Sequence, residues 1–140
     1  RCSRDWSSDV CSSDLLFSAF SLLLLGSLTS GSGPHSGDAK VASALPFDPA
    51  MMAMLHSGVM WLFLINLVVA WLRIPARRFS QRMLHGLTGI AGLNGIVGYA
   101  QFALGLPIGL VAVHVLLAAT LWVYASLLSF SLLYHATQPN

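Results

Sequence analysis

Three runs of apolar residues, each long enough to cross a lipid bilayer, constrain the fold of this chain more than any other feature. They cover approximately residues 50–72, 83–104 and 108–134, and a membrane-spanning helix needs about 20 such residues. Only 9% of the chain is charged, against roughly 25% in an ordinary soluble domain. A fourth run, approximately residues 15–29, is apolar but too short to span comfortably. Because helices satisfy their own backbone hydrogen bonds in lipid, we expect an all-α, polytopic membrane protein built as a four-helix bundle.

The N-terminal residues 1–14 differ in character from the rest of the chain. Residues 5–15 read DWSSDVCSSDL, which resembles the in-frame translation of a sequencing-library adapter. We therefore predict that residues 1–14 are an artefact and exclude them from reasoning about the fold. Both cysteines, Cys2 and Cys11, fall in this stretch, so no disulfide is expected. The native domain is predicted to cover residues 15–140, with its first helix truncated.

The charges near the helix ends predict how the chain crosses the membrane. Four arginines crowd the short connection between the second and third helices: Arg73, Arg77, Arg78 and Arg82. Positively charged loops stay in the cytoplasm, so loop 73–82 and the C-terminus are expected on the cytoplasmic side of the cell membrane, and loop 30–49 outside. Membrane lipid is the expected environment. No basic patch of the kind that binds nucleic acid is present, so nucleic acid is not an expected partner.

Two histidines stand at matching positions in the second and fourth helices. Pro49 and Pro107 each precede a histidine by seven residues, His56 and His114 respectively. Proline is favoured in the first turn of a helix, so each histidine is expected roughly 10 Å inside its helix. One helix separates the two, so they enter the membrane from the same side.

Two imidazoles at one depth on parallel helices predict a clamp for a metal centre. Ionisable side chains within a span usually mark function, and haem iron accepts an imidazole at each axial position. Zinc fits less well because it needs three or four ligands, and no cysteine or carboxylate lies near His56 or His114. The alternative for each histidine is a structural polar residue with satisfied hydrogen bonds.

No catalytic set of residues accompanies the two histidines. The chain has no glutamate, and beyond residues 1–14 its only carboxylates are Asp38 and Asp48, both in loop 30–49. Without a buried carboxylate we expect neither general-base chemistry nor an activated nucleophile, and we predict no catalytic residue in this chain. His35, in the same loop, is expected either to structure the loop or to line the rim of a site.

Small and polar residues within the helices predict helix–helix contacts. Glycine recurs at every third position of the third helix from Gly86 to Gly98, and small residues let membrane helices approach closely. Alternatively, the missing side chains leave room for the edge of a flat cofactor. Three amides lie within the apolar runs, Asn66, Asn94 and Gln101. We expect them to hydrogen-bond to neighbouring helices.

Several short motifs, in their order and spacing, resemble the C-terminal half of the haem A synthase family, of the actinobacterial type. They are GSGPHSGD at 31–38, LH at 55–56, GYAQF at 98–102, GLP at 105–107 and VH at 113–114. The resemblance covers residues 16–140. Some family members carry a cysteine pair in the loop that corresponds to 30–49, and this sequence has none there, which puts a redox role for the loop in doubt.

The resemblance implies an eight-helix membrane protein of two similar halves, of which this chain would supply the second. The family oxidises a methyl group of haem O to the formyl group of haem A for cytochrome oxidase. One half holds the substrate haem and the other a haem b cofactor, each between paired histidines. His56 and His114 match the pair that would hold the haem b iron. The implied partners are the missing N-terminal half with its haem O, and haem O synthase as a candidate.

Two other functions are compatible with the same residues. One is a non-enzymatic membrane module for packing or transport, in which the glycine-rich helix serves packing alone. The other is a small b-type cytochrome that reduces quinone or another carrier. Haem that copurifies in proportion to protein would distinguish the haem-binding hypotheses from the packing or transport module. The upstream gene sequence would distinguish the small b-type cytochrome from a haem A synthase.

Overall fold

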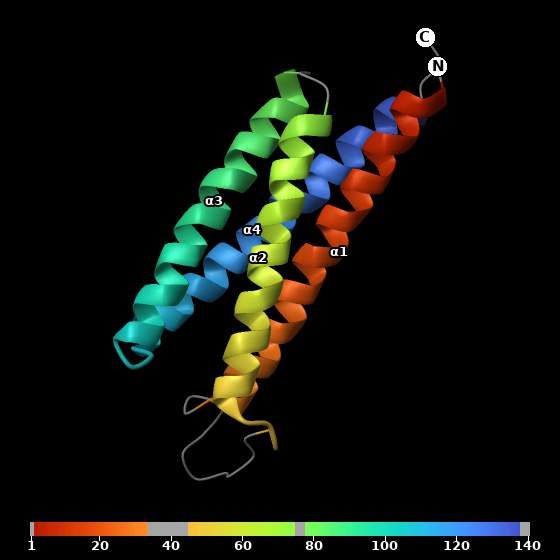
Figure 1. Cartoon of the computed structure of the whole chain (residues 1–140). Coiled ribbons are helices and arrows are strands. Elements are labelled where there is room, and N and C mark those ends of the chain that lie inside the picture. The colour runs from red at the N-terminus through yellow and green to blue at the C-terminus, as the bar shows by residue number, and fades with distance from the viewer. Residues whose placement is uncertain (1, 34–44, 75–77, 138–140) are drawn as a thin grey trace.

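The computed structural model describes residues 2–33, 45–74 and 78–137. It consists of four helices, α1 (Cys2–Ser32), α2 (Pro49–Arg73), α3 (Arg78–Ala103) and α4 (Ile108–Thr137). The prediction of an all-α chain with four helices is confirmed. α1 lies beside α2, α3 lies on the other side of α2, and α4 crosses behind α2 (Figure 1).

Prolines begin the two histidine-bearing helices, as the sequence predicts. Asp48 caps α2, because its carboxylate accepts a hydrogen bond from the N–H of Ala50 at 3.1 Å, and Pro49 occupies the first turn. The carbonyl of Pro107 accepts hydrogen bonds from the first turn of α4. Both helices begin at the same end of the bundle (Figure 1). We call this end, where α3 turns into α4, the turn end, and the opposite end, where α2 finishes at Arg73, the arginine end.

The first helix is longer than expected. We predicted a helix over 15–29, too short to span a membrane comfortably, whereas α1 runs from Cys2 to Ser32. Its segment Ser13–Ser32 is 20 residues long and apolar enough to cross a membrane. Residues 2–14 continue the same helix, because a polar stretch without glycine or proline can extend a helix that is nucleated further along the chain.

The third helix is less apolar than expected. Within the described residues, the segments long and apolar enough to cross a membrane are Ser13–Ser32, Pro49–Arg73 and Ile108–Leu132. α3, which contains the expected span 83–104, is not one of them, because arginines, amides and glycines lower its hydropathy. The helix is nevertheless 26 residues long, or about 39 Å, and runs alongside α4 (Figure 1). Three membrane-length helices make the chain a membrane protein.

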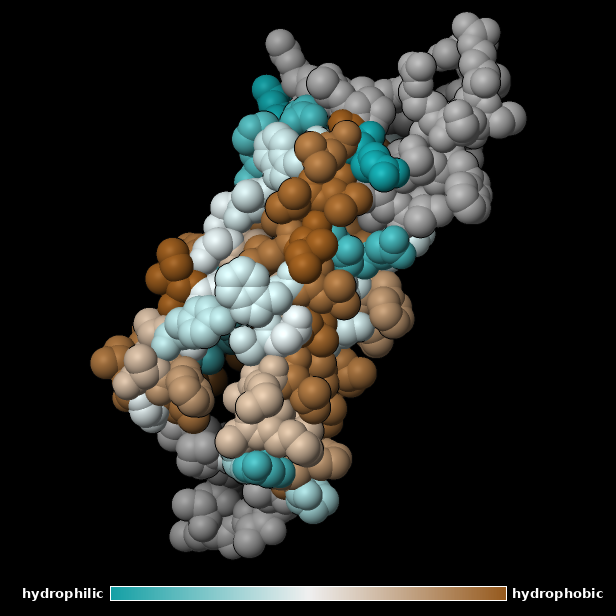
Figure 2. Space-filling view, in the orientation of Figure 1, coloured by the Kyte–Doolittle hydropathy of each residue, from teal (hydrophilic) through white to brown (hydrophobic). Residues whose placement is uncertain are grey.

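The buried core occupies the half of the bundle nearer the arginine end. Its members are Leu15, Ala19, Phe63, Leu67, Ala70, Ile74, Leu84, Leu87, Ala91, Leu121, Ala125, Leu128 and Leu132. Outside this cluster, large apolar side chains such as Leu72 and Met54 are mostly exposed, at 79% and 75%. Brown, apolar residues accordingly run the length of the visible surface (Figure 2). An apolar exterior of this kind suits a helix bundle that is surrounded by lipid tails.

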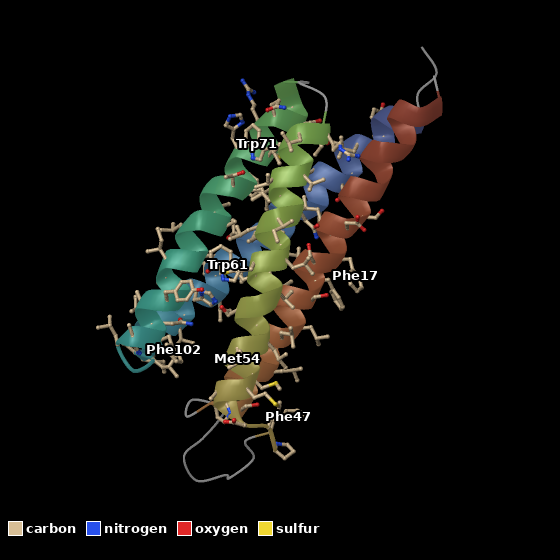
Figure 3. All side chains as sticks on the ribbon, viewed as in Figure 1. Phe17, Phe47, Met54, Trp61, Trp71 and Phe102 are labelled. Atoms are coloured by element: carbon tan, nitrogen blue, oxygen red, sulfur yellow. The ribbon has the colours of Figure 1, made fainter. Side chains whose placement is uncertain are left out.

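α2 and α3 contact each other least of the neighbouring helices. Among the described residues, two side-chain hydrogen bonds connect them. The indole N–H of Trp71 donates to the Thr88 hydroxyl at 2.9 Å near the arginine end, and the hydroxyls of Ser57 and Tyr99 are 3.3 Å apart near the turn end. Figure 3 shows Trp71 at the arginine end of this pair of helices and Phe102 at the turn end.

Candidate functional site

The imidazoles of His56 and His114 lie next to each other in the half of the bundle nearer the turn end. Their ring centroids are 6.2 Å apart and the ring planes are inclined by 76°. Both residues are half-buried. The sequence predicted two histidines at one depth on helices that begin at the same end, and the structure brings these two side chains together.

Each imidazole packs against a glycine of the preceding helix. A Cβ on Gly26 of α1 would lie 3.2 Å from Cε1 of His56, and a Cβ on Gly98 of α3 would lie 3.0 Å from Cε1 of His114. Both distances are shorter than ordinary van der Waals contact, so any larger residue would displace the ring. The two histidines are therefore held in the same way by two different pairs of helices, α1–α2 and α3–α4.

The two histidines and the two glycines that pack against them form one layer of the bundle, which we call the histidine layer. It lies next to the core, toward the turn end. Each of its four members is seven residues from a core residue on the same helix: Gly26 from Ala19, His56 from Phe63, Gly98 from Ala91 and His114 from Leu121. Residues seven apart lie on one face of a helix, about 10 Å apart. Two imidazoles and two glycines thus stand where the repeat would otherwise place packed apolar side chains.

The Nδ1 atoms of both histidines are buried and lack a hydrogen-bond partner within 3.5 Å among the described residues. The backbone of Leu22 faces the His56 ring, and the backbone of Asn94 faces the His114 ring. Leu22 and Asn94 each lie one turn before the glycine that backs the same ring. A metal-binding histidine usually directs its second nitrogen to a backbone carbonyl or another acceptor, and both rings face backbone of that kind.

The donor set fits a metal whose remaining coordination positions are filled by a macrocycle. Within the described residues no group of three or more histidine, cysteine, aspartate and glutamate side chains could hold a metal ion. Two imidazoles that hold one metal between them, with metal–nitrogen bonds of about 2.0 Å and ring radii of about 1.1 Å, would have centroids up to about 6.2 Å apart. The observed separation of 6.2 Å is short enough for both rings to hold one metal between them. Haem iron is the centre that takes two axial imidazoles.

Among the other histidines, His85 is described and lies away from this pair. His35 lies outside the described residues, and so do Asp38 and loop positions 34–44. His85 is near the arginine end, where its ring meets Trp71 edge-on at a centroid distance of 4.6 Å and its Nδ1 is 2.6 Å from the Gln81 carbonyl oxygen. The structure therefore places His85 far from the pair formed by His56 and His114.

The amides follow the sequence prediction only in part. Asn66 is confirmed as an interhelical residue, because its amide N–H donates to the Ser18 hydroxyl at 3.2 Å. The side-chain oxygens of Asn94 and Gln101 do not follow it, because they are buried and have no hydrogen-bond partner among the described residues. Both lie on the Gly98 face of α3, one turn to either side of that glycine.

Sequence reasoning missed two features of the site. It did not single out Gly26, because one glycine in an apolar run has no distinctive spacing. It also did not pair Ser57 with Tyr99, whose contact depends on how α2 and α3 cross. The visible surface is paler, and so less apolar, over this part of α2 and α3 (Figure 2).

No family model, no curated protein and no solved structure matches this chain.

Proposed function

We propose that the chain binds a b-type haem between His56 and His114 and serves as an electron-transferring part of a membrane oxidoreductase. The observation that carries this proposal is the 6.2 Å separation of the two imidazole centroids, which suits two axial ligands of one iron. A haem with imidazole at both axial positions transfers electrons and offers no open position to a substrate.

The residues of this chain would hold and orient the group. The imidazoles would supply the two ligands, and Gly26 and Gly98 leave the space that the rings occupy beside α1 and α3. The core on the arginine side of the layer excludes water from one edge. Because helices carry every one of these residues, their spacing is fixed more firmly than in a loop.

We further propose that the intact protein is a haem A synthase of which this chain is the C-terminal half. The support is the resemblance of the motifs around 31–38, 55–56, 98–107 and 113–114. On this proposal α3 also crosses the membrane, loop 73–82 and the C-terminus are cytoplasmic, and loop 30–49 is outside. The N-terminal half of the same protein would hold haem O and supply the acid–base residues that this sequence lacks.

A reduced-minus-oxidised absorption spectrum of the full chain, purified from membranes, tests haem binding directly. We expect a low-spin b-type spectrum, with haem in proportion to protein. His56→Ala and His114→Ala should each abolish it, because each removes one axial ligand. His85→Ala is the matched control, since His85 lies near the arginine end beside Trp71, and it should leave the spectrum unchanged.

Two results would contradict the proposal. A helical, folded parent chain without haem would favour the packing or transport module. A spectrum that survives both histidine substitutions would place the haem elsewhere. The family assignment has a separate test, which is conversion of haem O to haem A by the full-length gene: a b-type spectrum without this conversion would favour a small b-type cytochrome.

A further inference from the structure

Four buried side-chain polar atoms in the described part of the chain have no hydrogen-bond partner: His56 Nδ1, Asn94 Oδ1, Gln101 Oε1 and His114 Nδ1. They come from three helices, yet all lie in the half of the bundle nearer the turn end. Buried polar groups without partners are costly and rare. Because the two histidine rings face the backbone of Leu22 and Asn94, the amides of Asn94 and Gln101 are the members of this set that are available to a polar group outside the chain.

Gln101 is the member of this set that lies closest to the turn end. It follows Gly98 by three residues on α3, so its side chain leaves the helix on the same side as the glycine that backs His114. Along the helix axis it stands about 4.5 Å beyond Gly98 toward the turn. An amide presents both N–H donors and a carbonyl acceptor, and rotation of the amide brings its N–H₂ to the buried position.

A second donor stands on the other side of α3. Tyr99 and Ser57 share one hydrogen bond, at 3.3 Å, in which either hydroxyl can be the donor. The pair has two hydroxyl protons and uses only one in that bond, so the second proton is free to be donated. Tyr99 is 52% exposed, and its contact with Ser57 places its hydroxyl beside α2, next to His56 in sequence.

The arginines are too distant to take part. Arg73 follows His56 by 17 residues on α2, which corresponds to about 25 Å along the helix. Arg82 precedes Gly98 by 16 residues on α3, or about 24 Å. An anionic group carried by a ligand at the histidine pair therefore cannot reach the positive end of the bundle. Among the described residues, the hydrogen-bond donors near the turn end are neutral.

We propose that the Gln101 amide and the Tyr99 hydroxyl bind the carboxylates of the haem that His56 and His114 hold, with the carboxylate edge of the ring directed to the turn end. This inference rests on the haem-binding function proposed above. It assigns the orientation of the ring as well as its ligands. A buried carboxylate needs hydrogen-bond donors, and these two residues supply them.

Titration of the haem-free full chain in detergent, with iron protoporphyrin IX and with its dimethyl ester as probes, tests the assignment. The ester keeps the iron and the ring but has no anionic carboxylate. We expect the parent to bind the acid about tenfold or more tightly than the ester, because hydrogen bonds to charged groups are among the stronger ones. In the double variant Gln101→Leu/Tyr99→Phe the two probes should bind with equal affinity.

Asn94→Leu is the matched control. It replaces an amide on the same face of α3, on the core side of Gly98, and should keep the preference for the acid even if both affinities fall. An unchanged preference in the Gln101→Leu/Tyr99→Phe variant, with the low-spin spectrum intact, would overturn the carboxylate assignment alone. A parent chain that binds neither probe with a low-spin spectrum would overturn the haem-binding function itself.

Discussion

Gly98 and His114 pack so closely that a Cβ at position 98 would lie 3.0 Å from Cε1 of the imidazole. Gly26 has nearly the same relation to His56, at 3.2 Å. A glycine of one helix therefore fixes the position of a histidine on the next helix along the chain, and it does so twice. The separation of the two imidazoles is set by how closely α1 approaches α2 and α3 approaches α4.

Gly98→Ala is expected to move the His114 ring and weaken haem binding. A methyl group at 3.0 Å is tighter than nearly all real Cβ contacts, and overpacking a close contact typically costs about 1–3 kcal/mol. The affinity for haem, measured from the Soret absorbance, should fall about tenfold or more, since 1.4 kcal/mol corresponds to one factor of ten.

Gly92→Ala provides the comparison on the same helix. A Cβ at position 92 would meet nothing within 4 Å, so this variant should bind haem like the parent. It should also be slightly more stable, by about 0.5–1 kcal/mol, because alanine favours the helix over glycine. Equal haem affinity for Gly98→Ala and Gly92→Ala would show that the glycine at position 98 does not set the ring position.

A second close approach joins the middle of α4 to the start of α3. A Cβ on Gly86 would collide with the edge of the Tyr124 ring. Gly86→Ala should therefore destabilise the bundle by about 1–3 kcal/mol, and Tyr124→Leu should relieve much of that penalty in the double variant. Thermal unfolding in detergent measures the coupling. Additive effects of the two substitutions would contradict the contact, and Gly89→Ala, which meets nothing within 4 Å, should show no coupling with Tyr124.

The sequence predicted four helices and placed the two histidines at one depth, although it underestimated the length of α1. Proline at the start of a helix is a local signal, because it depends on the backbone of one turn, and both Pro49 and Pro107 mark the starts correctly. The depth of His56 and His114 then follows by counting residues. α3 was harder to predict, because its glycines and amides weaken the hydropathy signal of a helix that packs against α4.

The partners of the histidines could not be read from the sequence. Gly26 and His56 are 30 residues apart and meet only through the crossing of α1 and α2. The same holds for Ser57 and Tyr99. Asn94 and Gln101 show the limit most clearly: an amide in an apolar helix predicts a hydrogen bond to a neighbour, and only the structure shows that the side-chain oxygens have none.

The hydrogen bond between Trp71 and Thr88 should stabilise the weak α2–α3 contact. Thr88→Val removes the hydroxyl that accepts the hydrogen bond of the Trp71 indole N–H at 2.9 Å. Interhelical hydrogen bonds in membrane proteins contribute about 0.6 kcal/mol on average and up to about 1.7 kcal/mol, so the unfolding free energy should fall within that range. Thr120→Val is the control, because its hydroxyl bonds to the Leu116 carbonyl of its own helix. An equal loss in both variants would mean that the interhelical bond contributes nothing.

The turn between α3 and α4 depends on one glycine. Gly105 has φ of +74°, and the following Leu106, with φ of +62°, donates its N–H to the Gln101 carbonyl at 2.7 Å. This is the 6→1 hydrogen bond that closes a helix C-terminus when the preceding residue is left-handed. Alanine in that conformation costs about 1–2 kcal/mol, so Gly105→Ala should lower the unfolding free energy by about that amount.

Gly109→Ala makes this last prediction specific to the turn. Gly109 lies in the first turn of α4, and a Cβ there would meet nothing within 4 Å, so the substitution should be neutral or stabilising. Gly105→Ala should also weaken haem binding, because the turn fixes how Gly98 of α3 is placed against His114 of α4. Stability measured by thermal unfolding and affinity measured by Soret titration should therefore fall together in Gly105→Ala. If stability falls while haem affinity is unchanged, the turn does not position the histidine, and the α3–α4 packing alone does so.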